Sequence, residues 1–545
     1  MSDLLAGAGV LVAAASAATA ILLPSGRPRC LVMLVALVLF PTLILGDQWH
    51  SHQIVDLRDD PARFAGLAAI AVATSAAIAL AFRRWPILLP LAIVAALPFR
   101  IPLHAGGDTA NLLVPLYLVI AGGVLATALR TWAVSRADVP AGGAAGGTAP
   151  EEASATAGGG GFPAATGPAG PARWLALVLA TVVVLYATQT LYSPDFSKGL
   201  QNVCFFFVPF SLVYALLRDV SWSRKLLAAV LWVVAVEAIA FVVVGSVEYA
   251  TKSLFWNDQV IRSNEFHTYF RVNSIFWDPN IYGRYLSLVA VIATSALLWA
   301  RERRAFALLT ALLVVVWIGL APTFSQSSFA ALLAGLAVLA ALKWSLRWTL
   351  VAVGLVAVVG ALVVLLAGGS DKASVSRINI DTSGRANLVS GGVHLFAQRP
   401  LYGYGSGSFP KAYRQHVRTR KIPVSVSHTE PITVAAEQGL VGLAAYLALL
   451  VTALWTMTTG LQRPRPAGPV AAGDPPPPAV AEASSGAVRP ATPPAGETVA
   501  RAAVLAAFAA LLVHTMAYAG FFEDPITWVL LALAASLAPP GRAVG

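Results

Sequence analysis

Residues 226–247 read LLAAVLWVVAVEAIAFVVVGSV, and Glu237 is the one charged side chain in this run. A bilayer core about 30 Å thick is crossed by roughly 20 consecutive apolar residues when they form an α-helix. A run of this length and composition therefore predicts a transmembrane helix. Similar runs recur along the chain, which indicates that lipid surrounds most of the protein.

The composition of the whole chain leads to the same prediction. Of the 545 residues, 57% are hydrophobic and 12% are charged, whereas an ordinary soluble chain carries about 25% charged residues. A soluble protein with so few charges could not cover its surface, so an array of soluble domains is excluded. The two cysteines, Cys30 and Cys204, lie inside apolar runs and indicate neither a disulfide framework nor a metal site.

Fifteen segments are candidate membrane spans, namely residues 3–23, 30–46, 65–82, 85–99, 111–129, 173–192, 201–217, 226–247, 281–300, 305–322, 328–342, 348–368, 431–457, 502–520 and 526–540. Several of them are short, so we expect about 12–15 spans. The predicted fold class is an all-α, polytopic transmembrane helix bundle. The first segment has no basic residues before its apolar run, and we interpret it as a retained span rather than a signal peptide.

The lysines and arginines predict the orientation, because cytoplasmic connections carry an excess of positive charge. Alternate connections hold Arg27, Arg29, Arg83, Arg84, Arg130, Arg136, Arg173, Arg218, Arg224, Lys225, Arg301, Arg303, Arg304, Lys343, Arg347, Arg463, Arg465, Arg489 and Arg501. We therefore expect these connections in the cytoplasm, with the N-terminus outside and the C-terminus inside.

The expected organisation alternates helical regions with two linkers and two outer loops. Transmembrane helices are expected within residues 1–136, 173–368, 431–457 and 502–545, with an outer loop at 248–280 and a larger extracytoplasmic loop at 369–430. The segments 137–172, rich in glycine and alanine, and 458–501, rich in proline, separate these regions. Neither can bury enough apolar surface to order itself, so both are predicted to be flexible cytoplasmic linkers.

The larger outer loop, residues 369–430, is basic. It holds nine Lys and Arg residues against three Asp and Glu residues, a net charge of +6 out of +11 for the whole chain. The positive-inside bias is weak for long loops, so this charge calls for another explanation. One interpretation is a solvated face or contact with anionic headgroups. The other is a site for a phosphorylated ligand, because arginine forks match phosphate oxygens.

Two local structures are expected inside this loop. Residues 384–398 are predicted to form a helix, and Val389, Val393 and Phe396 are spaced as an apolar stripe that could pack on the membrane domain. The sequence GYGSGSF at 403–409 is predicted to be a tight turn rather than a phosphate-binding loop, because no strand precedes it and no helix clearly starts after it.

His428 closes the loop, just before Thr429 and the apolar run that starts near Pro431. Threonine is a reasonable N-cap and proline is favoured in the first turn. The histidine is therefore expected at the N-terminus of a span, where free backbone N–H groups favour anions. A neutral imidazole with a pKa near 6.5 suits proton abstraction from a hydroxyl. The position of His428 in the sequence is equally compatible with a role in capping or packing the helix, and this alternative stays open.

Other ionisable residues lie at or near membrane depth. Arg271 and the turn at 278–280 precede a span that carries Arg284 in its first turn. This arginine could snorkel to the headgroups, or it could face a polar cavity, because ionisable residues in the membrane are costly. By the same argument Glu237 and His514 are expected to face the bundle interior, either as structural partners or as site residues.

Three segments resemble the O-antigen ligase family. HTEPITVAAEQGLVG fits its His-x10-Gly-x2-Gly pattern with His428, Gly439 and Gly442 in register, although Thr429 stands where the family usually has Asn, Ser or Gln. FRVNSIFWDPNIYGRYL resembles a family segment in which an arginine is followed by a turn of the D/E-P-N type and by the next span. Arg284 and Leu288 also satisfy the family's Arg-x3-Leu pattern. SGRANLVSGGVHLFAQRPLYGYGSGSF resembles the family's arginine, helix and Pro-x2-Gly-x-Gly stretch.

The resemblance covers roughly residues 200–460 and implies an inverting, metal-independent glycosyltransferase with a bundle like that of the GT-C class. The donor would be a glycan linked to undecaprenyl diphosphate. Arg271, Arg284 and Arg385 would hold the diphosphate, and Arg399 is a weaker candidate for that role. His428 would orient or deprotonate the acceptor hydroxyl. The resemblance implies no cofactor and no metal.

The resemblance also implies partners and a location. We expect a multi-pass protein of the bacterial inner (cytoplasmic) membrane, with its site facing outside and membrane lipids around it. The acceptor, whether glycan, lipid or protein, and the choice between ligase and polymerase stay open, and no nucleic acid is expected. The alternative is a polysaccharide or lipid transporter or flippase of the cell envelope. Transporters favour inverted repeats, and no internal repeat is visible in the sequence.

Overall fold

The computed structural model describes residues 3–51, 54–55, 58–105, 108–137, 170–255, 257–266, 269–355, 385–417, 426–459, 461 and 495–539. The helices are α1 (Asp3–Leu22), α2 (Arg27–Asp47), α4 (Pro61–Arg84), α5 (Leu88–Ala96), α6 (Val114–Ala137), α7 (Pro171–Thr190), α8 (Phe196–Asn202), α9 (Val208–Leu217), α10 (Arg224–Thr251), α11 (Asp258–Phe266), α12 (Pro279–Leu298), α13 (Arg303–Leu320), α14 (Gln326–Lys343), α17 (Arg385–Gln398), α18 (Phe409–His416), α19 (Glu430–Thr458), α20 (Ala495–Thr515) and α21 (Pro525–Leu537). A π-helical turn, Val203–Phe207, joins α8 to α9, and a 3-10 turn, Ala321–Thr323, follows α13.

The prediction of a polytopic helical membrane protein is confirmed. Twelve helices in the described part of the chain are long and apolar enough to cross a membrane. The only strands in that part are β1 (Ile101–Ala105) and β2 (Asp108–Leu112), which pair antiparallel.

Three of the fifteen candidate spans do not form full-length helices in the described residues. Segment 85–99 forms only the nine-residue α5, because Pro86 and Pro98 flank it and proline disrupts a helix interior. Segment 526–540 forms the 13-residue α21. For segment 348–368, a helix is described over Leu346–Leu355, and the remainder lies outside the described residues.

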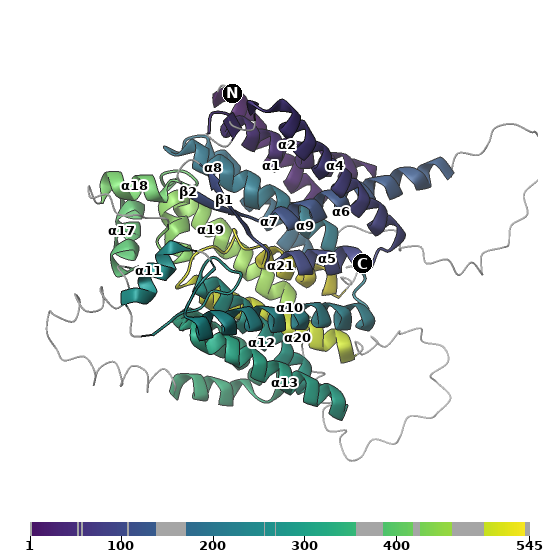
Figure 1. The fold of residues 1–545 in the computed structure, drawn as a ribbon, viewed down its shortest axis with the longest axis vertical. Coiled ribbons are helices and arrows are strands. Elements are labelled where there is room, and N and C mark those ends of the chain that lie inside the picture. Colours follow the sequence, from purple (N-terminus) through teal and green to yellow (C-terminus); the bar gives the residue numbers. More distant parts are fainter. Residues whose placement is uncertain are drawn as a thin grey trace, which may run out of the picture.

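The helices form two groups that lie one above the other in Figure 1. The upper group contains α1, α2, α4, α6, α7 and α9, and the lower group contains α10, α12, α13 and α20. Helix α19 contacts both α7 and α20, and α21 contacts both α9 and α20. These two late helices therefore connect the groups.

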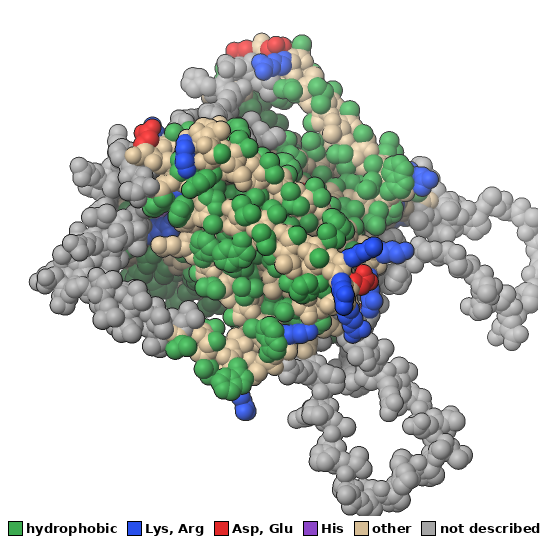
Figure 2. Space-filling model, turned by 60° about the horizontal axis from the view of Figure 1, so that its bottom comes forward, with side chains coloured by type: hydrophobic (Ala, Val, Ile, Leu, Met, Phe, Trp, Pro, Cys, Tyr) green, Lys and Arg blue, Asp and Glu red, His purple; other side chains and the backbone are tan. Residues whose placement is uncertain are grey.

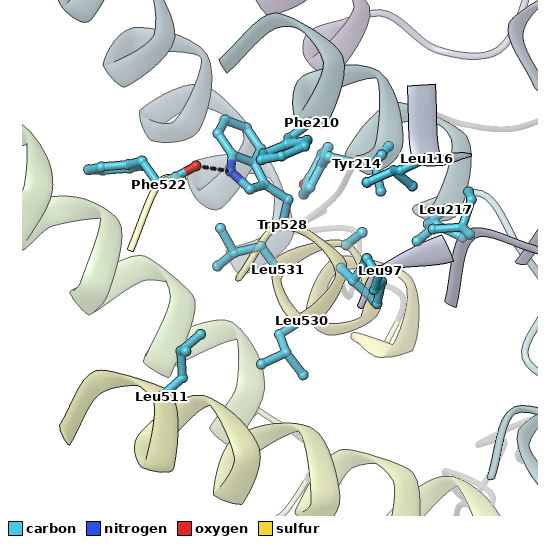
Figure 3. Close-up of a cluster of buried hydrophobic side chains, with 14 of the residues drawn as sticks. Leu97, Leu116, Phe210, Tyr214, Leu217, Leu511, Phe522, Trp528, Leu530 and Leu531 are labelled. Atoms are coloured by element: carbon cyan, nitrogen blue, oxygen red, sulfur yellow. Dashed lines mark hydrogen bonds between the residues drawn. The ribbon is translucent and has the colours of Figure 1, made fainter. Parts of the chain in front are cut away.

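The packing of Trp528 fixes the position of α21 (Figure 3). Its indole is fully buried and packs edge-to-face against Phe207 and Phe210. Its Nε1–H donates to the carbonyl of Phe522 at 3.0 Å. A buried indole that is hydrogen-bonded in this way stabilises a single packing arrangement, so the start of α21 and the loop before it are held firmly.

Much of the molecular surface is apolar. Figure 2 shows a broad hydrophobic face with Lys and Arg side chains towards its edges. On α13, five large hydrophobic side chains are about half exposed: Phe306, Leu308, Val314, Trp317 and Ile318. An exposed apolar belt bounded by charge is what a lipid-facing surface requires.

Helices α17 and α18 pack on the N-terminal half of α19, at the left of Figure 1. The predicted helix at 384–398 is confirmed as α17. Its predicted contact face is only partly right, because Val389 and Phe396 are no more than partly buried. Val393 is 49% exposed, whereas Gly391, Gly392 and Leu395 are buried. The two glycines lie against Tyr413 and Ile432. The absence of side chains there lets the helices approach closely, so glycine rather than valine marks the packed face.

Candidate functional site

The loop between α20 and α21, residues 516–524, is the meeting point of several elements. The buried carboxylate of Glu430, the first residue of α19, accepts hydrogen bonds from the backbone N–H of Gly520 at 2.8 Å and of Phe521 at 3.2 Å. The Thr429 hydroxyl donates to the carbonyl of Met516 at 3.0 Å. The start of α19, including His428, is therefore tied to this loop.

Arg284 reaches the same loop from α12. Its Nη2 lies 3.0 Å from Oδ2 of Asp524, and both side chains are about 4% exposed. Asp524 also caps α21, because its Oδ1 accepts from the backbone N–H of Ile526 at 2.9 Å. A buried charge requires a partner, so Arg284 faces the bundle interior and does not snorkel. Its Nη1 has no hydrogen-bond partner among the described residues.

Arg385 approaches the loop from the first residue of α17. Its Nη1 donates to the carbonyl of Ala517 at 3.3 Å. Its guanidinium also lies close enough to the His428 imidazole to lower the pKa of that group. Arg385 and His428 thus belong to one cluster, although 42 residues separate them in the sequence.

Arg271 lies on the segment that leads into α12. Its Nε donates to the carbonyl of Thr323 at 2.8 Å, and its Nη2 donates to Oδ1 of Asn280 at 3.2 Å. Ser325 donates to the same Oδ1 at 2.9 Å. Burial lowers the pKa of Arg271, whereas the carboxylate of Asp278 acts in the opposite direction. The guanidinium remains charged at any relevant pH.

His428 has an unusual backbone and a shifted pKa. Its φ of 63° lies in the left-handed region, where few residues other than glycine are found, asparagine and histidine among the exceptions. Burial is the main cause that lowers its pKa, followed by the charge of Arg385, while Asp278 raises it. The imidazole is therefore neutral at pH 7. Thr429 occupies the predicted N-cap position but forms no side-chain capping bond, because its hydroxyl is engaged with Met516.

The GYGSGSF segment is a tight turn, as predicted, and it packs on α19. The expectation that no helix follows it is wrong, because α18 begins at Phe409. Gly403, Gly405 and Gly407 all have positive φ. The N–H of Gly405 donates to the carbonyl of Glu437 at 2.7 Å, and the Glu437 carboxylate accepts from the N–H of Gly407 and of Phe409, both at 2.9 Å. The donors that a phosphate would need are therefore occupied by protein.

Gly439 breaks α19 where this turn docks. Its φ is 66°, and the N–H of the next residue, Leu440, donates to the carbonyl of Pro400 at 2.7 Å rather than within the helix. A Cβ on Gly439 would overlap the carbonyl of Leu401. The glycines of the GYGSGSF segment and Gly439 thus have a structural role, since they set the direction of the part of α19 that begins just after His428.

We expect Gly439→Ala to destabilise the protein by about 1–3 kcal/mol, because it combines an unfavourable positive φ with a steric clash. The melting temperature in detergent measures this effect. Gly66→Ala on α4 is the matched control, because a Cβ there would have no neighbour within 4 Å. Equal stability of the two variants would contradict the structural role of Gly439.

Arg399 is placed differently from the other predicted arginines. Its side chain is exposed, and its guanidinium carbon lies 4.5 Å from the ring centroid of Tyr404. No described contact connects it to the loop at 516–524. Arg271 lies close enough to Arg385 and Tyr518 for both to influence its pKa. Arg271, Arg284, Arg385 and His428 thus form one cluster, and Arg399 stacks on an aromatic ring outside it.

His514 and Glu237 both face protein, as expected from the cost of exposing them to lipid. Nε2 of His514 lies 3.2 Å from the hydroxyl of Ser327, and His514 is fully buried. Glu237 accepts a hydrogen bond from the Tyr285 hydroxyl at 2.9 Å. His514 adjoins the cluster, because its ring centroid lies 5.9 Å from that of Tyr518.

Sequence reasoning missed Tyr518, Asp524, Asn280 and Glu430 as residues of this cluster. Asp524 carried a recognisable signal, because an aspartate before proline and an apolar run marks the start of a helix. Tyr518 carried none, since an aromatic residue at the end of a span is ordinary in a membrane protein.

Comparison with known protein families identifies part of the chain. Residues 311–447 match the family described as O-antigen ligase (Wzy_C). This region is therefore similar to the O-antigen ligase family. The match includes Arg385, Arg399 and His428. It excludes Arg271 and Arg284, which lie in the same cluster as Arg385 and His428. A comparison with curated proteins gave no significant match.

Metal-ligating side chains do not gather into a metal site in the described residues. Among the residues that the structure describes, no group of three or more His, Cys, Asp or Glu side chains could hold a metal ion. Arginines and a histidine gather at the loop together with the carboxylates of Glu430 and Asp524, which are bound by backbone N–H groups and by Arg284. The arginines are the groups there that are suited to binding an anion.

Proposed function

We propose that this protein, whose residues 311–447 match the O-antigen ligase family, is an inverting glycosyltransferase of the bacterial cytoplasmic membrane. It would take a glycan from an undecaprenyl diphosphate donor and transfer it to a hydroxyl of a glycan, lipid or protein acceptor outside the membrane. The single observation that carries this proposal is the meeting of His428, Arg271, Arg284 and Arg385 around residues 516–524.

The arginines are suited to the donor's diphosphate. Arg284 presents an unpartnered Nη1 in a buried setting, and Arg385 uses one Nη1 contact to a carbonyl. Arg271 is oriented by two hydrogen bonds. Fixed cations in a low-dielectric site stabilise the charge that develops on a departing diphosphate. Arg399 would contribute at most at the edge of such a site.

His428 is suited to the acceptor hydroxyl. In the proposed reaction, the hydroxyl oxygen forms a bond to the anomeric carbon, and its proton passes to the imidazole. The bond from that carbon to the phosphate oxygen breaks, and its electron pair leaves with the diphosphate. Because burial and Arg385 lower the pKa of His428, the imidazole is free to accept this proton at neutral pH.

The test is transfer by the purified protein in liposomes that contain an undecaprenyl diphosphate glycan and an acceptor. The expected result is a glycosylated acceptor together with released undecaprenyl diphosphate. The alternative function, a transporter or flippase, would move the lipid-linked glycan across the bilayer without changing it. Movement of intact donor without transfer would therefore replace our proposal with that alternative.

The rate of transfer should depend on pH through His428. The neutral imidazole is the active form, so activity is lost as pH falls through its pKa. Because that pKa is lowered, the acid limb should lie below the ordinary value of about 6.5. In Arg385→Gln, one cause of the lowering is removed, so the limb should shift towards higher pH. The measurement is initial rate against pH, and an acid limb that does not move would contradict the assignment.

A further inference from the structure

Tyr518 lies at the centre of the cluster. Its ring centroid is 6.2 Å from that of His428 and 5.9 Å from that of His514. The guanidinium carbon of Arg284 lies 6.0 Å from the same centroid. The backbone N–H of Tyr518 donates to the carbonyl of His514 at 3.0 Å, so the residue is fixed to the end of α20.

The Tyr518 hydroxyl is open to a ligand. Among the described residues no hydrogen bond of this hydroxyl is found, and its oxygen is not one of the fully buried unsatisfied atoms. The hydroxyls of Tyr282 and Tyr285, in contrast, donate to the Phe241 carbonyl and the Glu237 carboxylate. Burial, followed by the nearby carboxylate of Asp278, raises the pKa of Tyr518. The phenol therefore stays protonated and can donate a hydrogen bond at every physiological pH.

Arg284 supplies a second unused donor next to this ring. The residue is 3% exposed, and its Nη1 lacks a partner while Nη2 pairs with Asp524. A buried donor of a charged group that stays unsatisfied is costly. The guanidinium carbon of Arg284 and the ring centroid of Tyr518 are 6.0 Å apart, and each side chain has a donor, one cationic and one neutral, without a described hydrogen bond. Such a pair fits an oxygen of an anion.

We propose that Tyr518 is a further substrate-binding residue, whose hydroxyl donates, beside Nη1 of Arg284, to a phosphate oxygen of the lipid-linked donor. This inference rests on the proposed function. As the bond between the anomeric carbon and the phosphate oxygen breaks, negative charge grows on the diphosphate. A fixed phenol donor stabilises that charge without adding a further positive charge beside His428.

The test removes only the hydroxyl. In Tyr518→Phe, kcat/KM for the lipid-linked donor should fall by about 10- to 100-fold, the usual effect of losing a hydrogen bond to a charged group. Inhibition of transfer by inorganic diphosphate should weaken to a similar extent. The KM for the acceptor should change by less than about twofold, since its hydroxyl is bound elsewhere.

Tyr214→Phe is the matched control, because the Tyr214 hydroxyl likewise has no described partner but lies on α9, away from the cluster. Transfer by this variant should equal that of the wild type. Wild-type kinetics in Tyr518→Phe, with impairment only in Tyr518→Ala, would overturn the inference, since the ring alone would then matter. Absence of transfer by the wild-type protein would instead overturn the proposed function itself.

Discussion

Replacing His428 with asparagine is expected to reduce glycan transfer by about 10²- to 10⁴-fold, the range that a positioned general base contributes. The imidazole lies in the cluster with a lowered pKa, and the variant removes its basic nitrogen. Asparagine is a better choice than alanine because φ at this position is 63°, and asparagine tolerates the left-handed region more readily. The initial rate in the liposome assay measures the effect.

His394→Asn is the control for this prediction. His394 is exposed on α17 and lies beside Gln398 rather than beside the loop at 516–524. This variant should transfer at the wild-type rate, and both variants should melt at the wild-type temperature. A folded His428→Asn protein that transfers normally would assign His428 to capping or packing, the alternative that its position in the sequence had left open.

The membrane architecture was predictable because each span is a local property. A run such as 226–247 can be recognised as a transmembrane helix without reference to distant residues, since its length and apolar character match the bilayer. The predictions of helix length and contact face that were wrong or only partly right also have local causes. Prolines shorten segment 85–99 to α5, and glycines rather than valines form the packed face of α17. A pattern of apolar residues does not reveal how closely two helices can approach.

The candidate site was less predictable because it is assembled from distant segments. The motif around His428 pointed to a histidine at a helix end, and the structure adds the partner that holds it there. That partner is the loop at 516–524, which hydrogen-bonds to Thr429 and Glu430. The loop lies beyond residues 311–447, so the family match covers the histidine but not its support. Only the packing of α20 and α21 brings Tyr518 and Asp524 to it.

Arg284→Met is expected to lose both stability and transfer, for reasons that can be separated. Arg284 and Asp524 form a buried ion pair at 3.0 Å. Removal of one member leaves the other charge buried without a partner, at a cost of about 3–5 kcal/mol. The loss of the cation should also lower transfer by about 10²- to 10³-fold, because the departing diphosphate is no longer stabilised. Melting temperature and initial rate measure the two effects.

The double variant Arg284→Met/Asp524→Asn distinguishes these causes. It removes both charges, and asparagine can still cap α21 by accepting from Ile526, as Asp524 does. Stability should return to within about 1 kcal/mol of the wild type, because no unpaired charge remains. Transfer should stay low.

Asp524→Asn alone keeps the cation and the cap, so it should transfer at least about tenfold faster than the double variant. Recovery of transfer together with stability would show that Arg284 only supports the fold, and the anion site would then rest on Arg271 and Arg385.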